Sequence, residues 1–195
     1  MAVAIRSQGT LSEQQLRDAE GRLGLSLPEE YRRWLAATNG GDPERGVTHP
    51  DRDVLWEHRA YGLQPDSPLE DLVHAYSYFQ DRFTPDYLPV AGVSGGLLAL
   101  KVKGEWHGSV WFWSDDDPRA SDEDTPADTE QLLYLCGESW DAFLERLQVP
   151  EPITDEELEE FVRRHNVRLE IGPAGDVEPR TDQGPRDEGG SGSSP

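Results

Sequence analysis

Residues 16–41 read LRDAEGRLGLSLPEEYRRWLAATNGG and predict two consecutive helices. The first half carries apolar side chains at helical spacing: Leu16, Ala19 and Leu23. Gly24 is a typical helix end, and Pro28 suits the first turn of the next helix, where its missing N–H has no helical partner to lose. The Asn-Gly-Gly run at 39–41 tolerates positive φ and ends the second helix. We expect the apolar faces of both helices to pack on a common sheet.

The stretches that flank this run predict another helix and a long loop. Upstream, residues 10–13 form a capping-box pattern that starts the first helix. Downstream, residues 42–63 are a long polar connection, with Trp56 embedded, that we expect to cross the surface as a loop. A second capping-box pattern at Ser67 predicts a third helix, whose apolar side chains recur at i, i+3, i+4, i+7 and i+10: Leu69, Leu72, Val73, Tyr76 and Phe79.

The middle of the chain predicts an antiparallel meander. Residues 87–93 and 97–102 predict two strands, and 108–113, rich in β-branched and aromatic side chains, predict a third. Residues 104–108 are a hairpin connection between the last two strands. Alternation of side chains in this hairpin predicts one core face and one partly exposed face. Residues 115–130 hold eight acids, one base and two prolines, so we expect an exposed loop.

The last third predicts a short strand at 132–135, a helix capped by Ser139, a further helix from Thr154 and a final strand at 167–171. Helices, then a meander, then helices indicate an α+β fold. We expect an antiparallel β-sheet meander packed against N-terminal and C-terminal helices.

Four segments follow from this pattern. Residues 1–9 are an N-terminal lead-in, 10–148 a folded domain, and 149–172 a C-terminal helix and strand extension. In the acidic Gly/Ser/Pro tail, 173–195, Val177 is the only large apolar side chain. We expect this tail to be disordered, because it has too little apolar surface to offset the entropy of ordering the chain.

Composition limits the classes of function. The 195 residues include 18 Lys and Arg against 39 Asp and Glu, a formal net charge of -21. This balance argues against a nucleic-acid partner and an anionic membrane surface, and favours a basic partner. The single cysteine, Cys136, excludes a disulfide within the chain, and no apolar stretch approaches the length of a membrane span. We expect a cytoplasmic monomer.

Several short motifs, in their order and spacing, resemble those of the SUKH superfamily, specifically the Smi/Knr-type domain. The opening run carries Glu20, Leu23-Gly24, Leu27-Pro28, Tyr31, Trp34 and Asn39-Gly40-Gly41. The second half carries Leu88 to Ala91, Leu97 to Val102, Gly108 to Val110 and Trp140 to Leu144. The resemblance spans roughly residues 10–148. It implies an α+β fold with helices packed about an antiparallel sheet.

The resemblance also implies a function. Many bacterial members are immunity proteins that neutralise a toxin by direct binding, and nucleases and nucleic-acid deaminases are prominent among those toxins. Related fungal domains are interaction modules in cell-wall signalling. We therefore expect a non-enzymatic immunity protein that occludes the active site of a cognate polymorphic toxin with a basic surface. The alternatives are an interaction or scaffold module without a toxin and, less favoured, a hydrolase or metal-dependent enzyme.

The candidate partner-binding residues are acidic or aromatic. They are Asp115, Asp116, Asp117, Asp122, Glu123 and Asp124 in the acidic stretch, Trp106 and His107 in the hairpin connection, and Asp51, Asp53 and Glu57 in the long connection. Carboxylates complement the cationic groove of a nuclease, and an exposed indole is a common binding hot spot. We expect Trp106 to be exposed in its glycine-flanked turn. The acidic stretch is equally consistent with a solvated loop that serves only solubility.

Other chemistries have weaker support. The acidic stretch departs from the EF-hand spacing for calcium, and His49 and His58 lie near carboxylates without a zinc-binding spacing. Cys136 lies in an apolar run and is expected to be a buried small hydrophobe and not a nucleophile. We therefore expect no metal, no cofactor and no catalytic residue.

Overall fold

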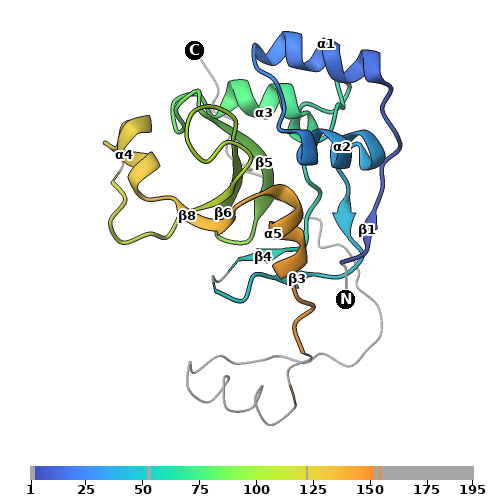
Figure 1. The fold of residues 1–195 in the computed structure, drawn as a ribbon. Helices are drawn as coiled ribbons and strands as arrows, with labels where there is room; N and C mark the ends of the chain where they lie inside the picture. The colour runs from blue at the N-terminus through green and yellow to red at the C-terminus, as the bar shows by residue number, and fades with distance from the viewer. Residues whose placement is uncertain (1–2, 52–53, 122, 152–153, 155–195) are drawn as a thin grey trace, which may run out of the picture. The chain divides into compact units, whose positions relative to one another are not determined.

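The computed structural model describes residues 3–51, 54–121, 123–151 and 154 (Figure 1). Five α-helices and antiparallel sheets in this part of the chain confirm the predicted α+β class. Contacts divide the chain into Met1–Glu151 and Pro152–Pro195, and only Thr154 of the second unit is described. The helix predicted from Thr154, the strand predicted at 167–171 and the tail predicted at 173–195 lie outside the described residues.

The first helix starts two residues later than the sequence predicted. In α1 (Glu13–Leu23) the N-cap is Ser12, whose hydroxyl accepts from the Gln15 backbone N–H while the Gln15 side chain accepts from the Ser12 backbone N–H. The Glu13 carboxylate, expected to close a box with Thr10, instead pairs with Arg32 of the next helix. The capping box is therefore real but shifted.

The second helix, α2 (Glu29–Thr38), ends as predicted in a left-handed turn. Asn39 has φ 47° and its side-chain oxygen accepts from the Leu63 backbone N–H at 2.8 Å. A Cβ built on Gly40, which has φ 81°, would lie 2.5 Å from the Ala60 carbonyl oxygen. The Asn-Gly-Gly run thus both ends the helix and lets the following chain approach closely.

The predicted loop at 42–63 contains strands, so that prediction is wrong in part. β1 pairs with β2 and β3 with β4: Ile5–Arg6 with Asp42–Pro43, and Val47–Thr48 with Leu55–Trp56. Trp56 is fully buried, and its indole N–H donates to the His58 carbonyl oxygen at 2.6 Å. A buried indole and its hydrogen bond hold this short-stranded segment against the core.

The third helix also differs from its prediction. A 3₁₀ turn, η1 (Pro68–Glu70), precedes α3 (Leu72–Tyr78), whose N-cap is the buried Asp71, which accepts from the His74 backbone N–H. Because η1 has a different period from an α-helix, Leu69 points outward and is 87% exposed. The predicted helical stripe therefore begins at Leu72, which is fully buried.

The central meander is confirmed. A four-stranded antiparallel sheet has the order β5-β6-β7-β8: Tyr87–Val93, Gly96–Lys101, Val110–Ser114 and Tyr134–Gly137. One face belongs to the main core. The opposite face, predicted to be partly exposed, carries a second apolar cluster: Phe83, Tyr87, Leu97, Ala99, Trp113 and Leu133. Phe83, Tyr87 and Leu133 come from outside the predicted hairpin, which is why alternation within the hairpin did not reveal this cluster.

The last helices complete the described fold. α4 (Pro126–Gln131), capped by Thr125, begins inside the stretch predicted as loop, so that prediction is wrong for residues 126–130. α5 (Trp140–Arg146) starts at the predicted cap, where Ser139 accepts from the Ala142 backbone N–H. α1 packs on α2 and α3, α3 on β5, and α5 on α2 and β8 (Figure 1). Cys136 is fully buried, as expected of a small hydrophobe.

The revised start of α3 gives a stability prediction. Leu72→Ala should lower the free energy of unfolding by about 2–5 kcal/mol, because it leaves a cavity in the core. Leu69→Ala is the matched control and should change it by less than about 0.5 kcal/mol. Urea denaturation of both variants measures the difference, and equal losses would contradict the outward position of Leu69.

Candidate partner-binding surface

The structure places four of the sequence-predicted site residues at the two ends of β7. The loop with Trp106 and His107 precedes Val110, whereas Asp115 and Asp116 follow Ser114 at the opposite end of the strand. Both residues of each pair are exposed. The expected acidic stretch and the expected indole anchor are therefore two separate features of the sheet.

Two acids of the long connection lie in different places. Glu57 and Asp115 both form hydrogen bonds with the turn between β5 and β6. The Ser94 hydroxyl donates to the Glu57 carboxylate at 3.3 Å, and the Asp115 backbone N–H donates to the Gly95 carbonyl at 3.0 Å. Asp51 pairs with Arg146 at the end of α5. Asp53 and Asp122 lie outside the described residues.

Asp117 is buried in the structure, which corrects its predicted place on the binding surface. Its side chain is 1% exposed and accepts hydrogen bonds from the Arg119 guanidinium at 2.7 and 3.0 Å and from the Tyr134 hydroxyl at 2.9 Å. Arg119, chiefly through its side chain, holds the pKa of Asp117 well below its usual range. The residue organises the loop, while Glu123 is exposed and Asp124 accepts from the Ser121 backbone N–H.

The loop that carries Trp106 has an unusual backbone. Trp106 is 54% exposed, as predicted, and has φ 65° in the left-handed region. Below it, the buried Ser109 donates its hydroxyl to the Trp106 carbonyl at 2.5 Å and accepts from the Trp111 indole N–H at 2.7 Å. A left-handed conformation costs a residue other than glycine about 1–2 kcal/mol. Strain of this kind, combined with a large exposed ring, points to a functional position.

A hollow of about 360 Å³ lies beside this indole. It is lined by Asp86, Tyr87, Lys101, Gly104, Glu105, Trp106, Trp111 and Glu130. The Lys101 ammonium lies 2.8 Å from Glu130, 3.6 Å from Asp86 and 4.1 Å from the Tyr87 ring centroid. Burial alone would lower the pKa of Lys101, but its hydrogen bonds to Glu130 and Tyr87 raise that pKa above its ordinary value. The ammonium therefore stays charged.

A second hollow, of about 170 Å³, lies beside His107. It is lined by Pro28, Glu29, Glu30, His107, Gly108 and Ser139. Glu30 accepts from the Asp141 backbone N–H at 3.0 Å, and hydrogen bonds from Ser139 and this N–H hold the pKa of Glu30 below its ordinary value. We call the residues that line the two hollows the tip surface. Its charged groups are five carboxylates and one ammonium, with His107 as a further titratable group.

Sequence reasoning named Trp106 and His107 but missed the acids around them. Asp86, Glu105 and Glu130 come from three separate segments. Antiparallel register brings them together, because Tyr87 is paired with Lys101 and the Val102 backbone N–H donates to the Asp86 carbonyl at 2.7 Å. The signal in the sequence that could have placed Asp86 near Lys101 is the expected meander, in which the strand at 87–93 pairs with the strand at 97–102.

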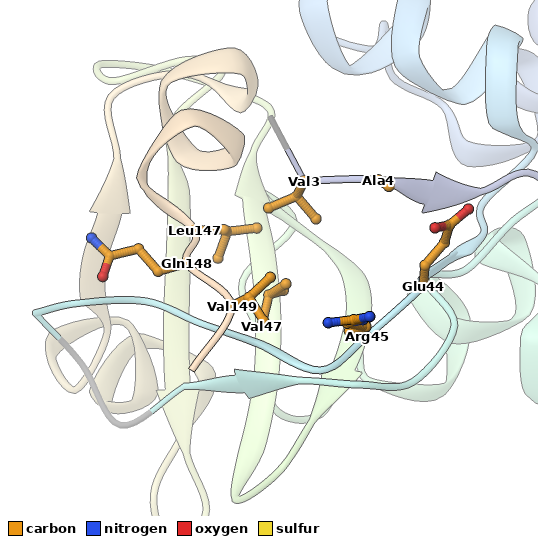
Figure 2. A pocket seen from close by; sticks show the side chains of 8 residues that line it. All are labelled: Val3, Ala4, Glu44, Arg45, Val47, Leu147, Gln148 and Val149. Carbon is orange, nitrogen blue, oxygen red and sulfur yellow. The ribbon is translucent and has the colours of Figure 1, made fainter. Parts of the chain in front are cut away.

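A larger hollow, of about 540 Å³, lies elsewhere in the fold, and its lining side chains are drawn in Figure 2. Its lining is mainly apolar and carries one acid and one base: Val3, Ala4, Glu44, Arg45, Val47, Leu147, Gln148 and Val149. With balanced charge and no histidine or cysteine, this lining does not match a basic protein or an acid–base site. The tip surface matches a basic partner better.

Among the residues that the structure describes, no group of three or more His, Cys, Asp or Glu side chains is arranged to hold a metal ion. None of the described helices combines the length and the apolar character that crossing a membrane requires.

The buried carboxylate of Asp117 gives a prediction about pH. Asp117→Asn should lower the free energy of unfolding at pH 7 by about 2 kcal/mol, because an amide cannot accept all the hydrogen bonds that the carboxylate accepts. The folded-state pKa is depressed, so this contribution is present above about pH 4 and is lost as the pH falls below it. The difference in the free energy of unfolding between wild type and variant should therefore become smaller as the pH falls from about 4 to about 2.

Asp116→Asn is the matched control for this measurement, because Asp116 is exposed. Thermal or urea denaturation across this pH range measures both variants. A gap for Asp117→Asn that stays constant down to pH 2 would contradict the assigned role of the ionised carboxylate.

A comparison with family models supplies the identity of the domain. Residues 10–146 match the SMI1 / KNR4 family (SUKH-1). The match covers more than half of the chain and includes every element from α1 to α5. A search of curated proteins found no match. The chain, with its α+β fold and its four-stranded meander, therefore belongs to the SMI1/KNR4 (SUKH-1) family.

Proposed function

We propose that this protein is an immunity protein that binds a cognate bacterial polymorphic toxin and covers its active site. Membership of the SUKH-1 family is consistent with a role in toxin immunity. The observation that carries the proposal is Trp106: an exposed indole in a left-handed turn that lines one hollow with carboxylates, next to His107, which lines a second. Such a surface suits a basic protein.

The proposed partner is a nuclease or another toxin that acts on nucleic acid. Such an enzyme needs a cationic groove for phosphates, and the tip surface offers five carboxylates against one ammonium to that groove. Trp106 is the proposed anchor that loses water on binding. The protein itself would carry out no reaction, so we propose a non-enzymatic, monomeric inhibitor that acts in the cytoplasm.

The remaining acids have a different proposed role. Asp115 and Asp116 are exposed beyond the end of β7 that lies opposite the Trp106 loop, and Glu123 is exposed further along the same acidic stretch. We propose that their negative charge raises the rate of association with a basic partner through long-range electrostatic attraction, without direct contact. This division separates electrostatic attraction from direct contact, and each part has its own test.

Direct contact is tested by co-expression with the toxin encoded by an adjacent gene, followed by growth rescue and pull-down. The wild-type chain should protect the cells. Trp106→Asn should weaken binding by at least about 2 kcal/mol, or about 30-fold, because it removes the anchor. The same change should keep the free energy of unfolding within about 1 kcal/mol, because asparagine tolerates the left-handed backbone.

Tyr78→Asn is the control, since it removes another exposed ring, 68% accessible, from α3. It should leave protection and affinity unchanged. Full protection by Trp106→Asn would refute the proposed anchor, and absence of protection by the wild-type chain would refute immunity against that toxin. A scaffold module without a toxin partner would give this second outcome with every toxin tested.

Electrostatic attraction is tested by the salt dependence of the association rate. We expect the rate constant with the cognate toxin to fall at least tenfold between about 20 and 500 mM salt, because exposed charges attract each other less as salt screens them. Stopped-flow fluorescence measures this rate through the tryptophans. A rate that does not change with salt would contradict the proposed role of the carboxylates.

A further inference from the structure

The hollow beside Trp106 already shows how this protein holds a cation. The Lys101 ammonium lies between two carboxylates, Glu130 and Asp86, and over the Tyr87 ring. The Lys101 side chain is 9% exposed, so this ammonium is a fixed part of the lining of the hollow. Carboxylates beside an aromatic ring are the combination that recognises positively charged groups.

Lys101 does not use all of the carboxylates and rings in this hollow. Glu105 is exposed and forms no ion pair with another described residue. Trp106 is more than half exposed. The Trp111 N–H is engaged by Ser109, so what Trp111 offers a ligand is ring surface. Three carboxylates share the hollow with one ammonium, which leaves a surplus of negative charge beside an open indole.

Guanidinium groups occupy similar environments elsewhere in the same chain. Arg82 lies over the Trp113 ring with 4.5 Å between its Cζ and the centroid, and Arg119 lies 5.2 Å from the Tyr134 ring while pairing with Asp117. A planar guanidinium both stacks on an aromatic face and donates a pair of parallel hydrogen bonds to a carboxylate. An ammonium lacks this planar stacking surface and two-pronged geometry.

We propose that the hollow lined by Trp106, Glu105 and Asp86 receives an arginine side chain of the partner protein. The guanidinium stacks on the Trp106 ring and pairs with the Glu105 carboxylate, and Asp86 and Glu130 add negative potential behind it. This inference rests on the proposed function, since it names the group through which a basic toxin engages the tip surface. An arginine that binds phosphate in the toxin would be masked in this way.

The test uses the full chain labelled with ¹⁵N and the peptide Ac-Gly-Arg-Gly-NH₂ as the probe. NMR titration follows the indole N–H signals of Trp106 and Trp111, with the former identified by its loss in Trp106→Asn. We expect both signals to shift and saturate. The peptide Ac-Gly-citrulline-Gly-NH₂, which has nearly the same shape without the charge, should bind at least about fivefold more weakly.

Two variants locate the binding site. Glu105→Gln should raise the dissociation constant of the arginine peptide about two- to fivefold, as expected for one partly exposed charge pair. Glu123→Gln removes the same charge from the acidic loop, outside the hollow, and should leave the constant unchanged. Equal effects of the two variants would show general attraction and overturn the proposed site.

The remaining outcomes are equally decisive. Equal binding of the arginine and citrulline peptides, or shifts confined to other tryptophans, would overturn the proposal. Equal binding of Ac-Gly-Lys-Gly-NH₂ would overturn the assignment of the occupant as arginine. The titration needs no toxin, so its failure leaves the immunity proposal standing. Failure of growth rescue together with a saturating titration would reject immunity against that toxin while keeping the arginine site.

Discussion

Trp140 holds the two ends of the described fold together. Its ring centroid lies 4.8 Å from those of both Tyr31 and Trp34 in α2, 5.6 Å from that of Phe143 and 6.5 Å from that of Trp56. It is fully buried, so these contacts add aromatic geometry to a large burial of apolar surface. Loss of this ring would remove aromatic contacts that α5 makes with both α2 and β4.

The hollow beside His107 lies where α5 meets α2. Once Trp140 joins α5 to α2, the N-terminal ends of the two helices can bond to each other: the Asp141 backbone N–H donates to Glu30, and Arg33 pairs with Asp141 at 2.6 Å. β8 leads directly into α5 and pairs with β7, which follows the Trp106 loop. The acids of α2 thereby come to lie beside His107, although the sequence separates them widely.

Local patterns in the sequence were sufficient for elements whose ends are decided by neighbouring residues. The αL end of α2 at Asn39, the Ser139 cap of α5 and the alternating strands of the meander are of this kind. α3 was predicted too early because two caps competed. Asp71 prevails over Ser67 because it also accepts from the Gln64 backbone N–H, while the Leu72 backbone N–H donates to the Gly62 carbonyl.

The candidate site was only partly predictable for the same reason. The exposure of Trp106 follows from the glycines on either side, but its left-handed backbone depends on Ser109 and Trp111, which act from the strand. In the sequence, nothing distinguishes Asp117 from the other acids of the stretch. Its carboxylate is buried where it accepts hydrogen bonds from Arg119 and Tyr134. The backbone conformation of Trp106 and the burial of Asp117 thus depend on side-chain contacts between residues that no local sequence pattern relates.

The hydrogen bonds of Ser109 beneath Trp106 have a consequence for how this family member can diverge. They anchor the loop through backbone and strand atoms, so the identity of the exposed residue at the turn contributes little to folding. Under the proposed function, exchange of that residue, even for one better suited to a left-handed turn, would alter partner choice without endangering the scaffold. Recognition and foldability can thus evolve as nearly independent traits at this position.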